Sequence, residues 1–140
     1  MKSTYTFHIR SCLPVLASGL PTGSHSYERG DYDNNGTLLY TFRQDVPIPS
    51  YLFAIASGEL ACATIGPRST IWTSPHELLD CQWELARDME RIIQTGESIV
   101  YPYVWGTYNV LILPASFPFG GKQEKNIWLH FYRCRERRGL

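Results

Sequence analysis

The stretch SPHELLDCQWELARDMERII, residues 74–93, decides the fold class because the hydrophobic period of the chain changes there. Ser74 is a favoured helix N-cap, Pro75 suits the first helical position, and Glu77 completes a capping box with Ser74. Apolar side chains then recur at spacings of three and four, which is typical of the buried face of a helix. These side chains are Leu78, Cys81, Leu85, Met89, Ile92 and Ile93. The pattern predicts one helix over about residues 75–94 that stops near Gly96.

The residues before this helix predict short strands separated by turns. In residues 4–10, Tyr5, Phe7 and Ile9 alternate with polar residues, which is the period of a half-buried strand. Asn35-Gly36 is a hairpin signal. VPIP (46–49) predicts an extended, irregular crossing, because neither of its prolines can donate a ladder hydrogen bond. Four further strands are predicted at TLLYTFRQ (37–44), YLFAIAS (51–57), ELACATI (59–65) and STIWT (69–73).

After the helix, the segment NVLILP (109–114) predicts a strand that runs directly into SFPFGG (116–121). Glycine lets a backbone approach a ligand closely, so this turn is a candidate binding loop, although a Gly-Gly pair alone is more often structural. The predicted fold class is therefore α+β, with a β-rich part to about Thr73 followed by a helix and a strand.

Charge and hydropathy exclude several classes of partner. The 140 residues include 13 basic and 13 acidic ones, so no net charge favours nucleic acid or an anionic membrane. The basic residues of RCRERR (133–138) form either a nucleic-acid patch or a solvated end, and we favour the solvated end. No apolar run approaches the ~20 residues that span a bilayer.

The cysteines indicate a reducing compartment. Cys12, Cys62, Cys81 and Cys134 form no CxxC pair, and no secretory signal precedes them. We therefore expect free thiols in a soluble, cytoplasmic protein.

One segment is close to a zinc motif. His76, Glu77 and Asp80 in HELLD (76–80) match HExxH except that Asp80 replaces the second histidine. We favour the alternative that the two carboxylates stabilise the positive end of a helix dipole. The four histidines show no metal-ligand spacing and no paired nucleophile, so no catalytic or metal residue is predicted; they are His8, His25, His76 and His130.

Three longer segments carry a family resemblance. VPIPSYLFAIASGEL (46–60), IGPRSTIW (65–72) and YPYVWGTYNVLILPASFPFGG (101–121), in this order, resemble the leukotriene A-4 hydrolase branch of the M1 zinc aminopeptidases. The resemblance implies a domain assignment in three parts. It places 1–73 at the end of the family's N-terminal β-domain, 74–121 at the start of its thermolysin-like catalytic domain, and 122–140 in a divergent basic tail.

The resemblance also implies a substrate site. In the family, a glycine pair lines the cleft and a following Met-Glu-Asn supplies a glutamate for the substrate's α-amino group. Phe119, Gly120 and Gly121 match the start of this motif and are the expected substrate-binding residues. Lys122, Gln123 and Glu124 then depart from it. Recognition of the amino group is therefore not carried over, either because a lysine repels a cation or because the register of the motif is lost.

The expected function follows from the same resemblance. The family removes N-terminal residues from peptides with zinc held by an HExxH region, and its leukotriene branch also suggests epoxide hydrolysis. That region is absent here, so we expect a fragment that is inactive by itself and binds no zinc, with peptide N-termini as weak partners.

Two alternatives stay open: a non-catalytic peptide-binding β module, and a splice or gene-model product without a function of its own. Against the module, the predicted helix stripe would lose the partner helices of the missing catalytic domain. The side chains concerned are Leu78, Leu85, Met89 and Ile92.

Overall fold

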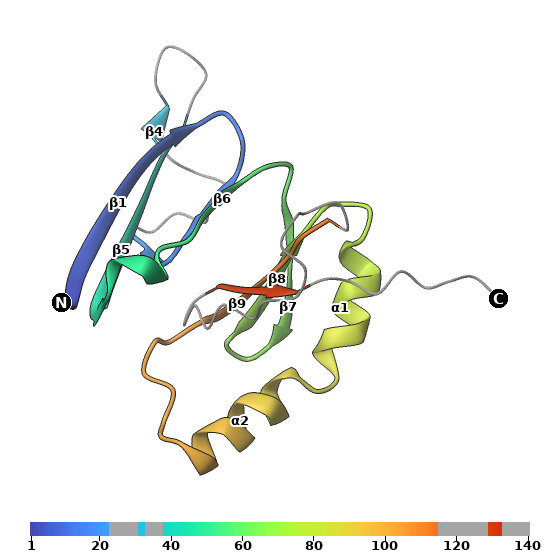
Figure 1. Ribbon diagram of the computed structural model, residues 1–140. Helices are drawn as coiled ribbons and strands as arrows, with labels where there is room; N and C mark the ends of the chain where they lie inside the picture. Colours follow the sequence, from blue (N-terminus) through green and yellow to red (C-terminus); the bar gives the residue numbers. More distant parts are fainter. Residues whose placement is uncertain (23–30, 33–37, 115–128, 133–140) are drawn as a thin grey trace. The chain divides into compact units, whose positions relative to one another are not determined.

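The computed structural model describes residues 1–22, 31–32, 38–114 and 129–132 (Figure 1). It divides into two compact units: Met1–Leu60 together with Leu129 form the first, and the other described residues from Ala61 onward form the second. The described chain is a strand-rich mixture of sheet and helix, as expected. The predicted boundary between residues 73 and 74 assigns the two segments to different domains of the family, and it stays a prediction.

The first unit is built around one long antiparallel pair of strands. Strands β1 and β5 pair with Phe7 opposite Phe42 and Ile9 opposite Tyr40. β3 and β4 both pair with β5, and β2 pairs with β6 in a separate two-stranded sheet. The elements are β1 Ser3–Ser11, β2 Val15–Ala17, β3 Leu20–Pro21, β4 Asp31–Tyr32, β5 Leu38–Ile48, the 3₁₀ helix η1 Ser50–Leu52 and β6 Ile55–Ser57.

A small apolar core and a buried polar group hold the first unit. Phe7 and Ile9 of β1 pack against a cluster of Val15, Ala17, Tyr40 and Phe42, which confirms the alternation predicted for β1.

Beside this cluster the fully buried Ser18 hydroxyl accepts a hydrogen bond of 2.8 Å from the Ala54 backbone N–H. The buried Gln44 amide donates to the Ser18 carbonyl at 3.4 Å, so these buried polar groups satisfy one another.

One prediction in this unit was confirmed in part and another was wrong. β5 continues through Val46 and Pro47 to Ile48, so the VPIP segment is extended and irregular, as predicted, but most of it belongs to a strand. The register between β1 and β5 shifts between Ser3 and Tyr5, and such an irregularity tolerates a proline. Residues 51–57 do not form one buried strand, because η1 comes first and only Ile55–Ser57 is a strand. The Asn35-Gly36 hairpin signal lies outside the described residues.

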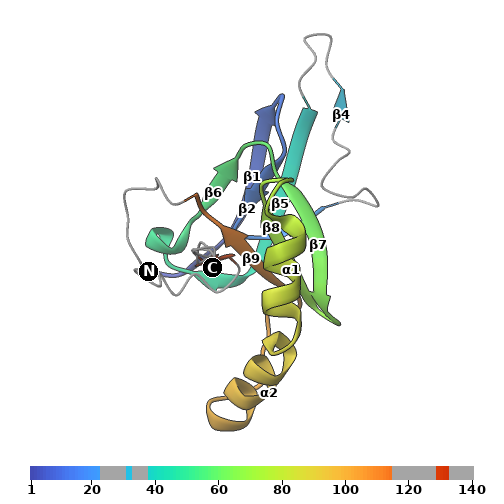
Figure 2. The ribbon, with the colours of Figure 1, turned by 90° about the vertical axis from the view of Figure 1, so that its right-hand side faces the viewer.

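The second unit packs two helices on a four-stranded sheet of order β10-β9-β8-β7. β7 and β8 form an antiparallel hairpin, whereas β8 and β9 are parallel. A parallel pair needs a crossover connection, and α1 and α2 supply it; Figure 2 shows them as two separate helices. The elements are β7 Ala61–Gly66, β8 Ser69–Thr73, α1 Leu78–Ala86, α2 Met89–Ile99, β9 Tyr108–Ile112 and β10 Leu129–Tyr132.

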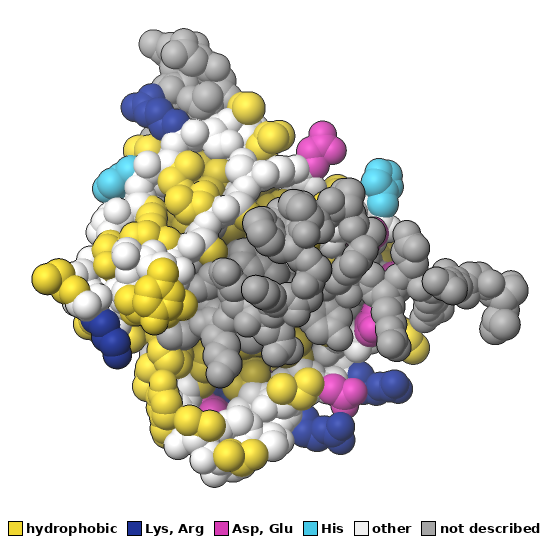
Figure 3. All heavy atoms as spheres, viewed as in Figure 1, with side chains coloured by type: hydrophobic (Ala, Val, Ile, Leu, Met, Phe, Trp, Pro, Cys, Tyr) yellow, Lys and Arg dark blue, Asp and Glu magenta, His cyan; other side chains and the backbone are white. Residues whose placement is uncertain are grey.

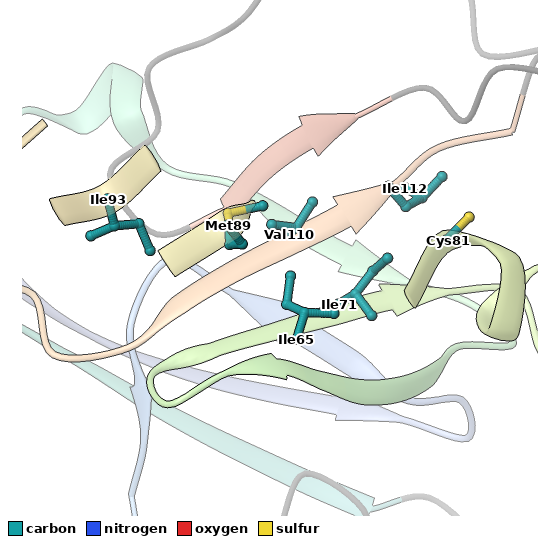
Figure 4. Packing of buried hydrophobic residues seen from close by; sticks show 7 residues of the cluster. All are labelled: Ile65, Ile71, Cys81, Met89, Ile93, Val110 and Ile112. Atoms are coloured by element: carbon teal, nitrogen blue, oxygen red, sulfur yellow. The ribbon is translucent and has the colours of Figure 1, made fainter. Parts of the chain in front are cut away.

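The helices and the sheet share one hydrophobic core. Both helices contribute buried side chains, as do β7, β8 and β9, and Figure 4 shows these side chains facing one another. The cluster consists of Ile65, Ile71, Cys81, Met89, Ile93, Val110 and Ile112. The strands predicted at 59–65, 69–73 and 109–114 are thereby confirmed.

The predicted single helix is wrong in its extent. A turn at Arg87 and Asp88 separates α1 from α2, and Gly96 lies inside α2, where its carbonyl accepts a hydrogen bond from the Val100 N–H. The first helix begins at Leu78 without a side-chain cap, because the Glu77 carboxylate instead accepts a 3.4 Å hydrogen bond from the Thr73 hydroxyl. The break lets each helix turn its own apolar side chains to the sheet.

The predicted apolar stripe is confirmed in all but one of its members. Leu78 and Leu85 pack against the core, and Met89 is 7% exposed, whereas Ile92 is 61% exposed. The stripe therefore finds its partner in the sheet of this same chain, except at Ile92. The apolar stripe is therefore no argument against the alternative of a standalone peptide-binding module.

Two further expectations concern the environment of the chain. No helix in the described part is both long enough and apolar enough to cross a bilayer. Cys12 and Cys62 are exposed and Cys81 is buried, and none of these three forms a disulfide. Cys134 lies outside the described residues, and the cytoplasmic location stays a prediction.

Candidate functional site

Strand β9 is the element that leads toward the predicted substrate turn. It pairs with β8 through Thr70 opposite Asn109 and Ile71 opposite Val110, and its residues 109–112 are buried. After β9 the described residues run to Pro114 and resume at Leu129. The predicted substrate-binding residues Phe119, Gly120 and Gly121 lie outside the described residues, so their role stays a prediction.

The main polar cluster of the second unit centres on Arg68, in the turn between β7 and β8. The two terminal nitrogens of Arg68 donate to the two carboxylate oxygens of Glu97 at 2.9 and 2.7 Å. The Nη2 atom of Arg68 also lies 3.1 Å from Glu90 Oε1. Glu90 and Glu97 are two turns apart on α2, so one guanidinium fastens this helix to the hairpin.

The same cluster holds the segment between α2 and β9. The Tyr103 N–H donates to Glu97 Oε1 at 2.9 Å, and the Tyr103 ring lies 6.0 Å from the Arg68 guanidinium carbon. The Tyr103 hydroxyl donates to the Thr107 carbonyl at 3.0 Å. The Tyr108 N–H donates to the Arg68 carbonyl at 2.7 Å. Arg68 thus fixes both ends of the connection into β9.

These contacts determine the charge states of the cluster. Hydrogen bonds from Arg68 and from the Tyr103 N–H lower the pKa of Glu97 to about 2, and the hydrogen bond to Glu97 raises the pKa of Arg68. Burial raises the pKa of Tyr108 to about 12 and also raises the pKa of Tyr103. None of these four groups titrates near neutral pH. Arg68 is occupied by two carboxylates, so the cluster suits a structural clamp better than an anion site.

The near match to HExxH does not form a metal site in the described residues. Asp80 lies in the first turn of α1, where a carboxylate interacts favourably with the helix dipole, and Glu77 precedes that turn and pairs with Thr73. Zinc takes three or four nitrogen, sulfur or carboxylate ligands. Residues 1–22, 31–32, 38–114 and 129–132 contain no group of three such side chains placed to bind a metal. The described residues therefore do not fit zinc.

An open groove runs along the outward side of α1. It is lined by Leu79, Gln82, Trp83, Ala86 and Arg87. Leu79 is 77% exposed and Trp83 67% exposed, and the Arg87 guanidinium carbon lies 5.9 Å from the Trp83 ring. The spacing of four between Leu79 and Trp83 could have indicated this second apolar face, which the sequence analysis missed.

Exposed apolar side chains also occur on α2 and just after it. They are Ile92, Ile99, Val100, Tyr101 and Val104. Figure 3 shows hydrophobic and charged side chains intermixed along the lower edge of the drawn face, where α2 lies in Figure 1. A mixed surface of this kind does not by itself define a ligand.

The clamp on Arg68 was also missed by the sequence analysis. Its signal was present in two acidic residues, Glu90 and Glu97, seven positions apart on the predicted helix. Arg68, in the turn of the β7–β8 hairpin, can form ion pairs with these two carboxylates only if the hairpin lies beside that helix. The pairing therefore depends on tertiary placement, which residue spacing alone does not supply.

The comparisons with known proteins give the class: the chain resembles one segment of proteins named leukotriene A-4 hydrolase or leucine aminopeptidase 2. No protein-family model matches the chain. It is 60% identical over 123 residues to the leukotriene A-4 hydrolase homolog of Botryotinia fuckeliana, covering 88% of this chain and 19% of that protein. It is 59% identical over 123 residues to leucine aminopeptidase 2 of Sclerotinia sclerotiorum, covering 88% and 20%.

The solved structures agree with the sequence relatives. The native yeast leukotriene A4 hydrolase superposes with a TM-score of 0.78 at 47% identity, covering 94% of this chain and 19% of the yeast chain. The resemblance inferred from the sequence is confirmed over this segment. The chain spans about a fifth of the length of the curated relatives it matches.

Proposed function

We propose that the chain performs the part that the corresponding fifth of a leukotriene A-4 hydrolase-like zinc aminopeptidase performs. The observation that carries this proposal is the 60% identity over 123 residues to the Botryotinia protein, and the fold shared with the yeast enzyme supports it. In this role the chain holds β9 in its sheet, so that the turn after it, residues 116–121, contacts the amino end of a peptide substrate.

The described residues support this role through β9. Its central residues are buried, and the Arg68 clamp fixes the connection that leads into it from α2. A strand held in this way gives the following turn a fixed starting point, as sites built on rigid elements require. In this proposal Phe119, Gly120 and Gly121 line the cleft, and residues 122–124 stand where the family has Met-Glu-Asn, with Gln123 at the position of the glutamate.

A chimeric enzyme tests the proposal. Residues 1–121 of this chain would replace the corresponding segment of the yeast leukotriene A4 hydrolase, and leucine p-nitroanilide hydrolysis and zinc content would be measured. We expect a folded, zinc-loaded chimera that turns over the substrate. Extending the graft through Lys122 to Lys125 gives a matched control in which the divergent residues enter the motif, and there we expect a raised KM. A folded, zinc-loaded chimera without turnover would contradict the proposal.

The isolated chain provides the complementary measurement. Because its described residues offer zinc no set of ligands, we propose that it hydrolyses no aminoacyl substrate, with or without added zinc. Zinc-dependent turnover together with stoichiometric zinc would overturn this part. Calorimetric titration with an uncleavable peptide separates the binding-module alternative, which requires saturable binding without cleavage.

A further inference from the structure

Strand β1 is the outermost described strand of the larger sheet in the first unit (Figure 1). It is nine residues long, whereas β3 and β4, the other strands that pair with β5, have two residues each. An outermost strand presents one row of backbone N–H and C=O groups away from its neighbour, and such a row pairs readily with another strand. Proteins commonly prevent this pairing with short strands, prolines, bulges or inward-facing charges. Residues 5–11 of β1 carry none of these four features.

The inner face of this sheet is covered at β5 but only in part at β1. Phe42 of β5 is 1% exposed and Tyr40 is 6% exposed. Their partners across the ladder, Phe7 and Ile9, are only half-buried, as is every second residue of β1. A strand added beside β1 would bring its own apolar side chains onto this face and remove more of Phe7 and Ile9 from water. The apolar face of the sheet therefore extends to the edge that β1 forms.

The sequence of β1 is complementary to itself when two copies run antiparallel. With Phe7 opposite Phe7 of the second copy, Tyr5 lies opposite Ile9, so the half-buried faces of the two strands coincide. Aromatic and aliphatic side chains placed directly opposite one another stabilise a sheet. This register pairs all nine residues of the strand, with Ser3 opposite Ser11 at each end. It gives each copy the same contacts, as a two-fold interface requires.

Charge selects this register over its neighbours. A slip by one residue would place apolar side chains opposite polar ones, on the wrong face of the sheet. A shift by two residues in one direction places Lys2 opposite Arg10, and a shift by two in the other direction places His8 opposite His8. In the register centred on Phe7, Arg10 lies opposite Thr4, so no like charges are opposed.

We propose that two copies of this chain associate by antiparallel pairing of β1 with β1 of the second copy, centred on Phe7. The pairing joins the two sheets into one continuous sheet. The opposite edges are formed by the short strands β3 and β4, so the pairing ends at two copies. One strand pair buries less surface than a stable dimer interface, and we therefore expect a weak association that forms at high protein concentration. This inference does not depend on the proposed function.

The sign of a charge effect at Thr4 tests the proposed register. Thr4 is exposed, and in the dimer it faces Arg10 of the second copy at two symmetric places. Thr4→Glu should therefore lower the Kd of dimerisation and Thr4→Lys should raise it, each by about 2- to 30-fold. Sedimentation velocity of the full chain, from about 10 µM to 1 mM, measures both. Changes of Kd in the same direction for the two variants would overturn the proposal.

The same charge changes on α2 give a matched control. Gln94 is exposed, and Gln94→Glu and Gln94→Lys should leave the Kd unchanged. A double variant then separates pairing across the edge from an effect of net charge. Thr4→Lys combined with Arg10→Glu restores opposite charges at both symmetric places, and we expect it to associate at least as tightly as the unaltered chain. A double variant as weak as Thr4→Lys alone would contradict the register.

Two measurements on the unaltered chain keep the proposal falsifiable even where a variant folds poorly. In a mixture of isotope-labelled and unlabelled chains, filtered nuclear Overhauser spectra should show contacts between Tyr5 of one copy and Ile9 of the other. Amide hydrogen exchange in β1 should slow as the protein concentration rises. A chain that stays monomeric up to about 1 mM, or that associates without these contacts in β1, would refute the proposal.

Discussion

Gly19 passes so close to β5 that no side chain fits there. A Cβ at Gly19 would lie 2.9 Å from both the carbonyl carbon and the oxygen of Arg43, and a backbone cannot move away cheaply. We expect Gly19→Ala to destabilise the first unit by about 1–3 kcal/mol, measured by urea denaturation. Gly58→Ala is the matched control, because a Cβ there meets nothing within 4 Å, and we expect it to leave the stability within about 0.5 kcal/mol. Equal losses in the two variants would contradict the close approach at Gly19.

The Arg68–Glu97 pair predicts how stability depends on pH. The pKa of Glu97 is lowered from 4.5 to about 2 by the hydrogen bond from Arg68. A lowered pKa stabilises the folded state fully above the unfolded value, and this contribution is lost as the pH falls from about 5 toward 2. We expect Glu97→Gln to be less stable than the unaltered chain at pH 7 and to approach it at pH 2–3, in urea titrations at each pH.

The exposed Glu59 gives a control for this measurement. Glu59→Gln should run parallel to the unaltered chain over the same pH range. If the gap between the chain and Glu97→Gln stays constant down to pH 2, the ion pair does not act as described.

At the scale of elements, α2 offers two neighbouring isoleucines in opposite environments. Ile93 is 8% exposed and belongs to the core of the second unit, whereas Ile92 is 61% exposed. We expect Ile93→Ala to cost about 2–4 kcal/mol through lost burial and a cavity, and Ile92→Ala less than about 0.5 kcal/mol. Chemical denaturation of both variants checks this, and a larger loss at Ile92 would reverse the assignment of the two faces.

The elements also show which features of the fold the local hydrophobic patterns predict. The alternation at Tyr5, Phe7 and Ile9 was sufficient for β1, because one face of that strand is half-buried and the other exposed. The helical spacing found the side chains of α1 and α2 but not the turn at Arg87 and Asp88. Asp88 occupies the N-cap position of α2 and belongs to a residue type favoured there, but no glycine or proline marks the break.

The candidate site was predictable only in part for the same reason. The strand that precedes the substrate turn follows from its apolar run, and the resemblance supplied Phe119, Gly120 and Gly121 as predictions. The clamp of Arg68 joins a hairpin to a helix 29 positions away, at Glu97. Contacts of this kind depend on how the elements meet, which no residue spacing encodes.

At the scale of the whole molecule, two separate cores predict two separable responses. The first unit has its own cluster around Phe42, and the second has its cluster around Ile71. We expect Gly19→Ala to lower amide exchange protection in β1 and β5 while β8 and β9 keep theirs, and Ile93→Ala to do the opposite. Hydrogen exchange read by mass spectrometry or NMR checks this. A loss of protection spread equally over both units would show that they unfold as one.

The hydrogen bond between the helix α1 and the strand β7 has a consequence for self-association. β7 is the outermost strand of its sheet, and an outermost strand invites pairing with a strand of another molecule. The Gln82 side chain donates to the Thr64 carbonyl at 2.9 Å, so one acceptor on this strand is already occupied. An incoming strand would have to displace that amide before pairing there. A side chain of α1 thereby hinders the pairing of another molecule's strand at this position of β7.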